Sequence, residues 1–591
     1  MRLLKKIAKL FQNIEHLLVN YFEFLRKSRF GLSIIFLFSS EITILKKTSN
    51  SNYHNLIKFK DKKNYLDKII VFFCLKFFIN KKNSNLIRLR SFYILMMHGK
   101  SYEFFKDEIL IFIFSQKISH WHSFFTYIFH TSVFYSEKGD SLNHAELLIN
   151  AFKMLYKNIK LSSKISAQQK IQIFSQTYYG SFQVLNNLNM KDFYRYMRIL
   201  LKIYIDNIHN IKPFKRLVNN KKNKRIKLGL TRFDFLGEIY TFHHLFKYLD
   251  FNLFDVVIIA FDKNGLEEFS TKYPNIKHLI LSKENIEASV LKARKENFDI
   301  ILNSTSLSGD FLSPVTKLLS SRIGNKQVQC FVDITTSGIK NIDFYIIGKF
   351  YGSNKVKSEF TEKVLTVGGV GWFLSRYKKI NINRSLVRNK FNLSNSDIVY
   401  ISNAHINKLN FENINLWLEI IKKTPNSFLL LMPYRGAFDK IQFDKPFKIM
   451  LNKILRNKRI NSNKVIIEDV NGSYQCMNNM IAGDIYLDSF PYSGPTCIVE
   501  SLALNIPPIS LKGNYYREQN AAGFLNEIDL NECIAETYDD YIDKAINMAS
   551  NYEMRKYLQA KIAKNMKTAS FHNAEYTAKE YSSLLESIAK M

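Results

Sequence analysis

Residues 484–511 read DIYLDSFPYSGPTCIVESLALNIPPISL, and the interpretation of the fold starts from this stretch. The apolar run at 484–488 predicts a strand, and the Ser, Pro and Gly residues after it predict a turn. The run at 496–504 predicts a helix, and the apolar residues at 508–511 predict the next strand. A strand, a helix and a second strand in this order are typical of a βαβ unit in a parallel sheet.

The same alternation of strands and helices continues on both sides of this stretch. In the C-terminal part of the chain, apolar runs predict strands at 398–402, 427–432, 464–468, 484–488 and 508–511, and helices near 411–423, 446–455, 474–482, 496–504 and 515–524. In the middle of the chain, similar runs predict strands at 225–231, 254–261, 277–281, 299–303, 328–332 and 344–347. We therefore expect an α/β fold with two doubly wound domains facing a cleft, in which ligands bind at the carboxyl ends of the strands.

The sequence predicts four segments in all. Apolar residues spaced near 3.6 apart predict an all-α N-terminal domain over residues 1–211. A run of Lys and Arg without any acid predicts a basic linker at 212–224. We expect an N-terminal Rossmann-like domain on the acceptor side at 225–390. A C-terminal Rossmann-like domain that binds the nucleotide, with a helical tail, is expected at 391–591.

Composition excludes several classes of protein. The chain has 591 residues, of which 46% are hydrophobic, too many for a disordered chain. Five cysteines without a CxxC pair exclude a disulfide scaffold and a zinc ribbon, and they favour a reducing compartment, so we expect a cytoplasmic protein. The net charge of +34 suits an anionic partner, but no DNA- or RNA-binding signature accompanies it, so we expect no specific nucleic-acid partner.

No apolar run in the sequence reaches the roughly 20 residues of a membrane span. The N-terminal segment from Leu3 to Leu25 instead has the spacing of an amphipathic helix, with Lys5, Lys6 and Lys9 among its apolar residues. Such a helix either lies on a membrane surface or packs on its own domain. Peripheral membrane contact through this helix is one of two open alternatives.

Candidate site residues follow the predicted strands of the C-terminal domain. Thr496 stands near the start of a predicted helix, where free N–H groups and the helix dipole favour a phosphate, and Glu500 lies one turn on, where it accepts hydrogen bonds from ribose hydroxyls. Lys408 and Arg435 come soon after two other strands and supply positive charge for a diphosphate. The alternatives are an ordinary turn and two ordinary surface cations.

In the N-terminal domain, Asp234 and Glu238 follow the first predicted strand. Either carboxylate is a candidate general base toward an acceptor hydroxyl or amide, and the alternative is a cap for the next helix. The chain contains no DxD triplet, no GxxxxGK[ST] loop and no GxGxxG placed after a strand. We therefore expect Lys, Arg and helix ends to balance the phosphate charge, without a metal or another cofactor.

Several stretches resemble the catalytic region of glycosyltransferase family 41. Thr336-Ser337-Gly338 followed by IDFYII at 342–347 is similar to the family's TSG…MDYII stretch, and FTEK at 360–363 is similar to its YTE+L segment. NAHINK at 403–408 is similar to its N-x-x-K loop, and the stretch at 484–507 keeps the family's spacing over more than twenty residues. The family includes SPINDLY-type and O-GlcNAc transferases and the bacterial N-glycosyltransferases that modify adhesins.

This resemblance implies a GT-B fold, a UDP-sugar donor, a protein acceptor and inverting transfer without a metal. It places Lys408 on the diphosphate, Thr496 on a phosphate, Glu500 on the ribose and His405 near the uracil. Three positions depart from the family pattern, where His, His, and His or Asn are replaced by Glu238, Cys476 and Pro495.

The sequence therefore predicts a cytoplasmic glycosyltransferase that moves a hexose from UDP to an Asn, Ser or Thr side chain. A transferase that acts on a lipid-linked or capsular saccharide is one alternative. A degenerate homologue that binds a UDP-sugar without transferring it is the other, and Glu238 and Cys476 at the family's His positions favour it.

Overall fold

The computed structural model describes part of the chain, and all of that part belongs to the second of two compact units, Met1–Ser132 and Val133–Met591. The described residues are parts of 135–156, then 188–208, 211–215, 225–232 and 247–591, the last range with gaps at 304, 308–312, 331–332, 378–379 and 435–436. The predicted N-terminal amphipathic helix and most of the predicted all-α domain lie outside these residues.

The first sheet has seven parallel strands in the order β3-β2-β1-β4-β5-β6-β7. Its central strands are buried on both faces. In β2, for example, Val256 and Ile258 join one apolar cluster, while Val257 and Ile259 join another on the opposite face. The strands are β1 (Ile226–Thr231), β2 (Phe254–Ala260), β3 (Lys277–Ile280), β4 (Phe298–Asn303), β5 (Gly324–Gln329), β6 (Phe344–Gly348) and β7 (Lys363–Val367).

The second sheet has six parallel strands in the order β10-β9-β8-β11-β12-β13. Both sheets therefore show the doubly wound order, in which the chain reverses direction across the sheet beside its first strand. The strands are β8 (Ile398–Ser402), β9 (Ser427–Leu431), β10 (Val465–Ile467), β11 (Ile485–Leu487), β12 (Pro508–Leu511) and β13 (Ile534–Ala535). We call the parts built on the two sheets the first lobe and the second lobe.

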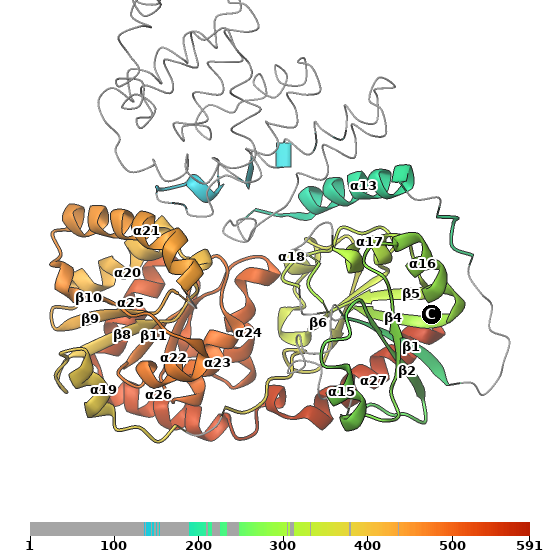
Figure 1. Cartoon of the computed structure of the whole chain (residues 1–591). Coiled ribbons are helices and arrows are strands. Elements are labelled where there is room, and N and C mark those ends of the chain that lie inside the picture. Colours follow the sequence, from blue (N-terminus) through green and yellow to red (C-terminus); the bar gives the residue numbers. More distant parts are fainter. Residues whose placement is uncertain are drawn as a thin grey trace, which may run out of the picture. The chain divides into compact units, whose positions relative to one another are not determined.

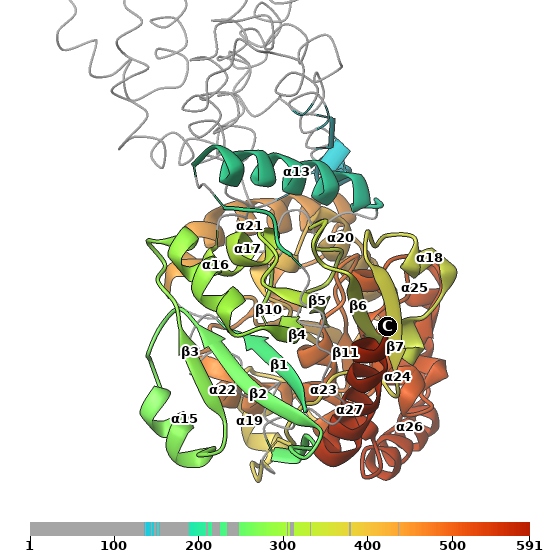
Figure 2. The same cartoon turned by 90° about the vertical axis from the view of Figure 1, so that its right-hand side faces the viewer.

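Helices cover both faces of each sheet. In the second lobe, α20 and α21 lie on one face of the sheet and α22, α23 and α26 on the other (Figures 1 and 2). The helices of the first lobe are α15 (Leu266–Lys272), α16 (Ile286–Lys295), α17 (Pro314–Ser320) and α18 (Asn354–Lys357). Those of the second are α19 (Arg384–Lys390), α20 (Phe411–Lys423), α21 (Ala437–Lys458), α22 (Gly472–Met480), α23 (Pro495–Ala503), α24 (Asn520–Glu527), α25 (Tyr538–Ser550) and α26 (Tyr552–Asn565).

The last helix, α27 (Ala574–Lys590), returns to the first lobe and lies against strands β4 and β7, where it is drawn in red (Figures 1 and 2). Its Glu580 accepts a hydrogen bond from the backbone N–H of Gly368 at 2.8 Å, and the Tyr581 hydroxyl donates to the carbonyl of Gly371 at 3.1 Å. In the same region, Glu527 of α24 accepts from the N–H of Val370 at 2.7 Å. Contacts from α24 and α27 thus join the C-terminal residues to the first lobe.

Helix α13 (Lys191–Ile208) is packed closely on the loop after β5. The buried Arg198 donates from Nε to the carbonyl of Ser337 at 2.9 Å. Gly338 has φ +66°, and a Cβ at this position would stand 2.5 Å from the backbone of Tyr194, so only glycine fits there. The TSG stretch that resembles family 41 is therefore a docking point for α13.

Several predicted boundaries differ from the structure. The predicted strand at 328–332 is observed at 324–329, because the polar residues from Gly324 pair in register with β4. The helix predicted to begin at Pro446 begins at Ala437, and the proline lies inside α21. Strands β7 and β13 were not predicted.

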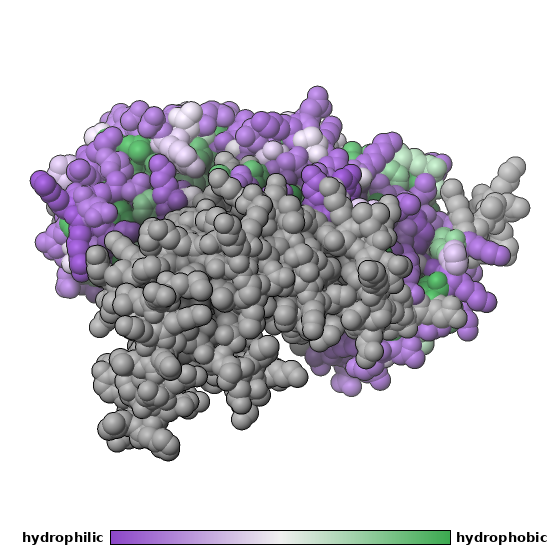
Figure 3. All heavy atoms as spheres, turned by 90° about the horizontal axis from the view of Figure 1, so that it is seen from above, coloured by the Kyte–Doolittle hydropathy of each residue, from purple (hydrophilic) through white to green (hydrophobic). Residues whose placement is uncertain are grey.

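On the face seen in Figure 3, the described surface is mostly hydrophilic with small apolar spots.

Candidate active site

The loop after β8 holds the first group of predicted site residues. Asn403 is fully buried directly after the strand, and His405 accepts a hydrogen bond at Nδ1 from the N–H of Asn407 at 3.2 Å. This interaction caps a single 3-10 turn over Ile406–Lys408. Since the turn is tied to the end of the strand, the backbone of Lys408 has a fixed position there.

The loop between β11 and α23 holds the second group. Asp488, which ends the apolar run, accepts from the N–H of Gly494 at 3.1 Å and from the Ser510 hydroxyl at 2.8 Å. Gly494 is the N-cap of α23, and no side chain caps this helix. Pro495 is buried at the first helical position, and Thr496 after it is exposed. No side-chain hydrogen bond caps the start of α23, where the N–H of Thr496 is the first after the proline.

Lys408 lies beside this helix start. Its Nζ is 4.0 Å from the centroid of the Tyr492 ring, and a Cβ added to Gly494 would stand only 3.2 Å from Nζ. The structure thus brings Lys408, Pro495 and Thr496 to one place. An ammonium group and the positive end of a helix dipole together favour a phosphate or diphosphate at this point.

The buried carboxyl group of Asp488 supports the start of α23 beside Lys408. Burial raises the pKa of Asp488 to about 7, while hydrogen bonds from Gly494 and Ser510 and the positive charge of Lys408 act in the opposite direction. The carboxylate holds Gly494 in place and changes its charge near neutral pH. The sequence analysis gave Asp488 no role, although its position at the end of a predicted strand is the same signal that identified Lys408.

Glu500 and Cys476 form a second cluster around Asn403. The Asn403 amide donates to Glu500 Oε2 at 2.5 Å and to Cys476 Sγ at 3.4 Å, and Cys497 Sγ donates to the Asn403 carbonyl at 3.8 Å. Glu500 is only 6% exposed, so its carboxylate is almost entirely buried in this cluster. Sequence reasoning named Glu500 and Cys476 but missed the asparagine that connects them.

Tyr377 extends this cluster from the segment between the lobes. Burial raises the pKa of the Tyr377 hydroxyl above its usual range, and the charges of Glu500, Cys497 and Cys476 act in the same direction. These interactions place the tyrosine near the cluster around Asn403. No feature of the sequence distinguishes Tyr377 from the other tyrosines of the chain.

Three predicted site residues, Asp234, Glu238 and Arg435, lie outside the described residues. For Lys408 and the start of α23, the topology explains why they meet. Strands β8 and β11 are neighbours, and the chain leaves β8 toward one edge of the sheet and β11 toward the other. A crevice at such a reversal point is the usual place for a nucleotide in a doubly wound sheet.

Residues 377–582 match the sequence model described as Glycosyl transferase family 41. Two curated relatives are named probable UDP-N-acetylglucosamine--peptide N-acetylglucosaminyltransferase SPINDLY, and each is 26% identical to this chain. The protein of Hordeum vulgare aligns over 29% of this chain and 18% of its own length, and that of Arabidopsis thaliana over 27% and 17%. This chain therefore spans less than a fifth of the length of these relatives.

In structure, the chain is similar to a mutant O-GlcNAc transferase of Thermobaculum terrenum, with a TM-score of 0.60 and 13% identity over 89% of this chain and 98% of that one. This likeness confirms the predicted α/β architecture of GT-B type with two Rossmann-like lobes. None of the described helices combines the length and the apolar character that a membrane crossing requires. Sequence and architecture thus point the same way: residues 377–582 are similar to glycosyltransferase family 41, and the fold is that of a GT-B enzyme.

Proposed function

We propose that the chain is a glycosyltransferase that moves a hexose, of glucose or N-acetylglucosamine type, from a UDP-sugar to a protein side chain. The observation that carries this proposal is the meeting of Lys408 with the start of α23 at the ends of two adjacent strands. The names of the curated relatives, which specify a UDP-sugar donor and a peptide acceptor, support the same donor and acceptor here.

The geometry suits the departure of a nucleoside diphosphate. As the bond to the sugar breaks, negative charge grows on the phosphate next to the sugar. The ammonium of Lys408 and the N–H groups at the start of α23 are positioned in advance to stabilise that charge, which is commonly the largest contribution to catalysis. We propose that these groups do so without a metal ion and that the transfer inverts the anomeric carbon.

Glu500 is proposed to bind the ribose hydroxyls, since its carboxylate is oriented by the Asn403 amide at 2.5 Å. His405 is proposed to lie near the uracil, on the turn that also carries Lys408. Asp234 or Glu238 is proposed as the base that removes the proton of the acceptor. Arg435 is proposed as a second cation for the diphosphate.

The proposal is tested by UDP release and by the mass of acceptor peptides, with UDP-glucose and UDP-N-acetylglucosamine as donors. Lys408→Met is expected to lower turnover by about 100-fold or more, as the loss of one preorganised donor does in other enzymes. Lys422→Met, which removes an exposed lysine of α20, is the matched control and keeps full turnover. Equal turnover in the Lys408 variant and the control would contradict the proposal.

A second function, binding of a UDP-sugar without transfer, is favoured by one observation. Cys476 stands where the resemblance places a His of the family. Its buried thiol contacts the amide of Asn403, and it lacks the ring nitrogen with which a His would bind a ligand. Calorimetry distinguishes the two functions. UDP binding together with no turnover of any donor on any peptide would support the second function over the first.

A further inference from the structure

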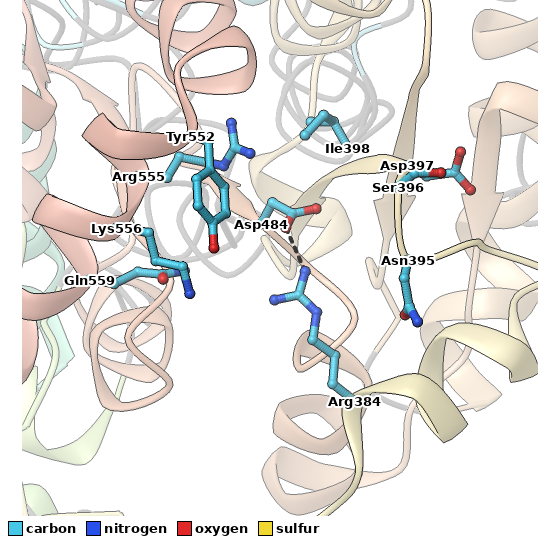
Figure 4. A pocket seen from close by; sticks show the side chains of 10 residues that line it. All are labelled: Arg384, Asn395, Ser396, Asp397, Ile398, Asp484, Tyr552, Arg555, Lys556 and Gln559. Atoms are coloured by element: carbon cyan, nitrogen blue, oxygen red, sulfur yellow. Dashed lines mark hydrogen bonds and ion pairs between the residues drawn. The ribbon is translucent and has the colours of Figure 1, made fainter.

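A polar pocket of about 370 Å³ lies at the amino ends of strands β8 and β11, whereas the candidate active site lies at their carboxyl ends. It is lined by residues that precede β8 and β11, namely Asn395, Asp397 and Asp484, whereas the active-site loops follow these strands. Helix α26 closes the pocket on the opposite side (Figure 4). This volume falls in the range of pockets that bind small metabolites.

The pocket carries an excess of positive charge. Asp484 is neutralised by two arginines, with Arg384 at 2.5 Å and Arg388 at 2.6 Å. Arg555 and Lys556 of α26 also line the pocket, and no carboxylate of the described residues is ion-paired with either of them. Arg555 is held in place by the carbonyl of Met548, to which it donates at 2.6 Å. The lining thus holds three cationic side chains, Arg384, Arg555 and Lys556, against the two carboxylates of Asp397 and Asp484, and its net positive charge favours an anion.

The remaining lining suits a ring that bears hydroxyl groups. Tyr552 is 56% exposed and turns its ring into the middle of the pocket, between Lys556 and Arg384 (Figure 4). Amide groups stand on the two sides, from Gln559 on α26 and from Asn395 opposite (Figure 4). Amides donate to and accept from hydroxyl groups, and an aromatic face packs against a sugar or a base.

We propose that this pocket binds a phosphate monoester carried on a polyhydroxylated ring, as in a sugar phosphate or a nucleoside monophosphate. The phosphate lies against Lys556 and Arg555, and the ring packs on Tyr552 within reach of Asn395 and Gln559. Because the pocket and the active-site loops lie at opposite ends of the strands of one sheet, we expect the ligand and the donor to bind independently. The site stands whether or not the chain transfers a sugar.

Calorimetry with the full chain tests the site, with glucose 6-phosphate, AMP, inorganic phosphate and glucose as probes. At least one of the two esters is expected to bind more tightly than phosphate or glucose, and saturating UDP leaves its affinity unchanged. The ester that binds identifies the ring. Lys556→Gln is expected to weaken binding about tenfold or more, because it removes a charge-assisted hydrogen bond.

Lys564→Gln is the matched control, since Lys564 is exposed on the same helix but does not line the pocket. Tyr552→Ala is expected to weaken the esters and to leave inorganic phosphate unchanged. The inference is overturned if neither ester binds, if phosphate alone binds as well as the esters, if UDP displaces the ester, or if the two lysine variants behave alike. A failure of UDP to bind would contradict the proposed function and leave this test intact.

Discussion

The buried ion pair between Arg517 and Glu359 predicts that two substitutions, each removing one charge, have unequal effects. The side chains are 1% and 0% exposed, and Glu518 lies 3.6 Å from the same guanidinium. Arg517 also donates to the carbonyl of Leu188 at 2.6 Å. One cation of the second lobe thus faces two carboxylates, of which Glu359 comes from the first lobe.

Burial raises the pKa of Glu359 from 4.5 to about 7, and the charge of Arg517 opposes this rise. At about 1.36 kcal/mol per pKa unit, the folded protein disfavours the ionised carboxyl relative to the protonated one by on the order of 3 kcal/mol. Since the folded-state pKa is raised, this contribution to stability is complete below pH 4.5 and is lost as the pH rises through 7.

Glu359→Gln is therefore expected to cost about 1 kcal/mol or less at pH 8, because a neutral side chain replaces a charge that burial already disfavours. Arg517→Met leaves two buried carboxylates without their cation, and we expect it to cost about 3–5 kcal/mol. The free energy of unfolding of Arg517→Met is also expected to fall more steeply than that of Glu359→Gln as the pH rises.

Urea unfolding followed by tryptophan fluorescence at pH 6 and pH 8 measures both effects. Lys590→Gln, which breaks the exposed ion pair with Glu586 at 2.6 Å, is the control and is expected to cost less than about 0.5 kcal/mol. A Glu359 variant as unstable as the Arg517 variant at pH 8 would refute the reasoning, since it would mean that the ionised pair is strongly favourable as a whole.

Four further substitutions test the site and the packing around it. Asp488→Asn is expected to make UDP affinity less dependent on pH: with a pKa of about 7, the wild-type carboxylate gains its charge beside Lys408 between pH 6 and pH 8 and weakens binding there. If calorimetry gave the same pH dependence of UDP affinity for the wild type and the Asp488 variant, this expectation would be contradicted. Gly338→Ala is expected to lower the free energy of unfolding by about 2 kcal/mol or more, because φ is +66° and the new Cβ meets the backbone of α13. Gly472→Ala, with φ +83° and open space around it, is expected to cost about 1 kcal/mol, and equal losses would argue against the close packing of α13. Glu500→Gln is expected to raise the Kd for UDP about tenfold and to leave that for pyrophosphate unchanged, whereas a loss of both would place Glu500 near the phosphates.

The sequence was a good guide wherever the decisive contacts are local. Strand β8 was predicted with its observed bounds, because its apolar residues are contiguous and both of its faces are buried. The start of α23 was predicted from the Ser, Pro and Gly residues before Thr496. The rule that ligands bind at strand ends then directed attention to Lys408, which the structure places beside that helix.

Features that depend on distant pairing were not predictable from one sequence. Asn403 contacts Glu500 across 97 positions of the chain, and Arg517 reaches Glu359 across 158. Strand β5 begins with the polar residues GNKQ, and its register with β4, rather than its composition, makes it a strand. The apolar pattern reports burial and gives no information on which partner lies opposite.

The most direct test of the central claim is a crystal structure of the chain with UDP. We expect the diphosphate within hydrogen-bond distance of Lys408 Nζ and of the N–H groups that begin α23, with the ribose beside Glu500. A nucleotide bound elsewhere on the chain, or no bound nucleotide at a saturating concentration, would contradict the account.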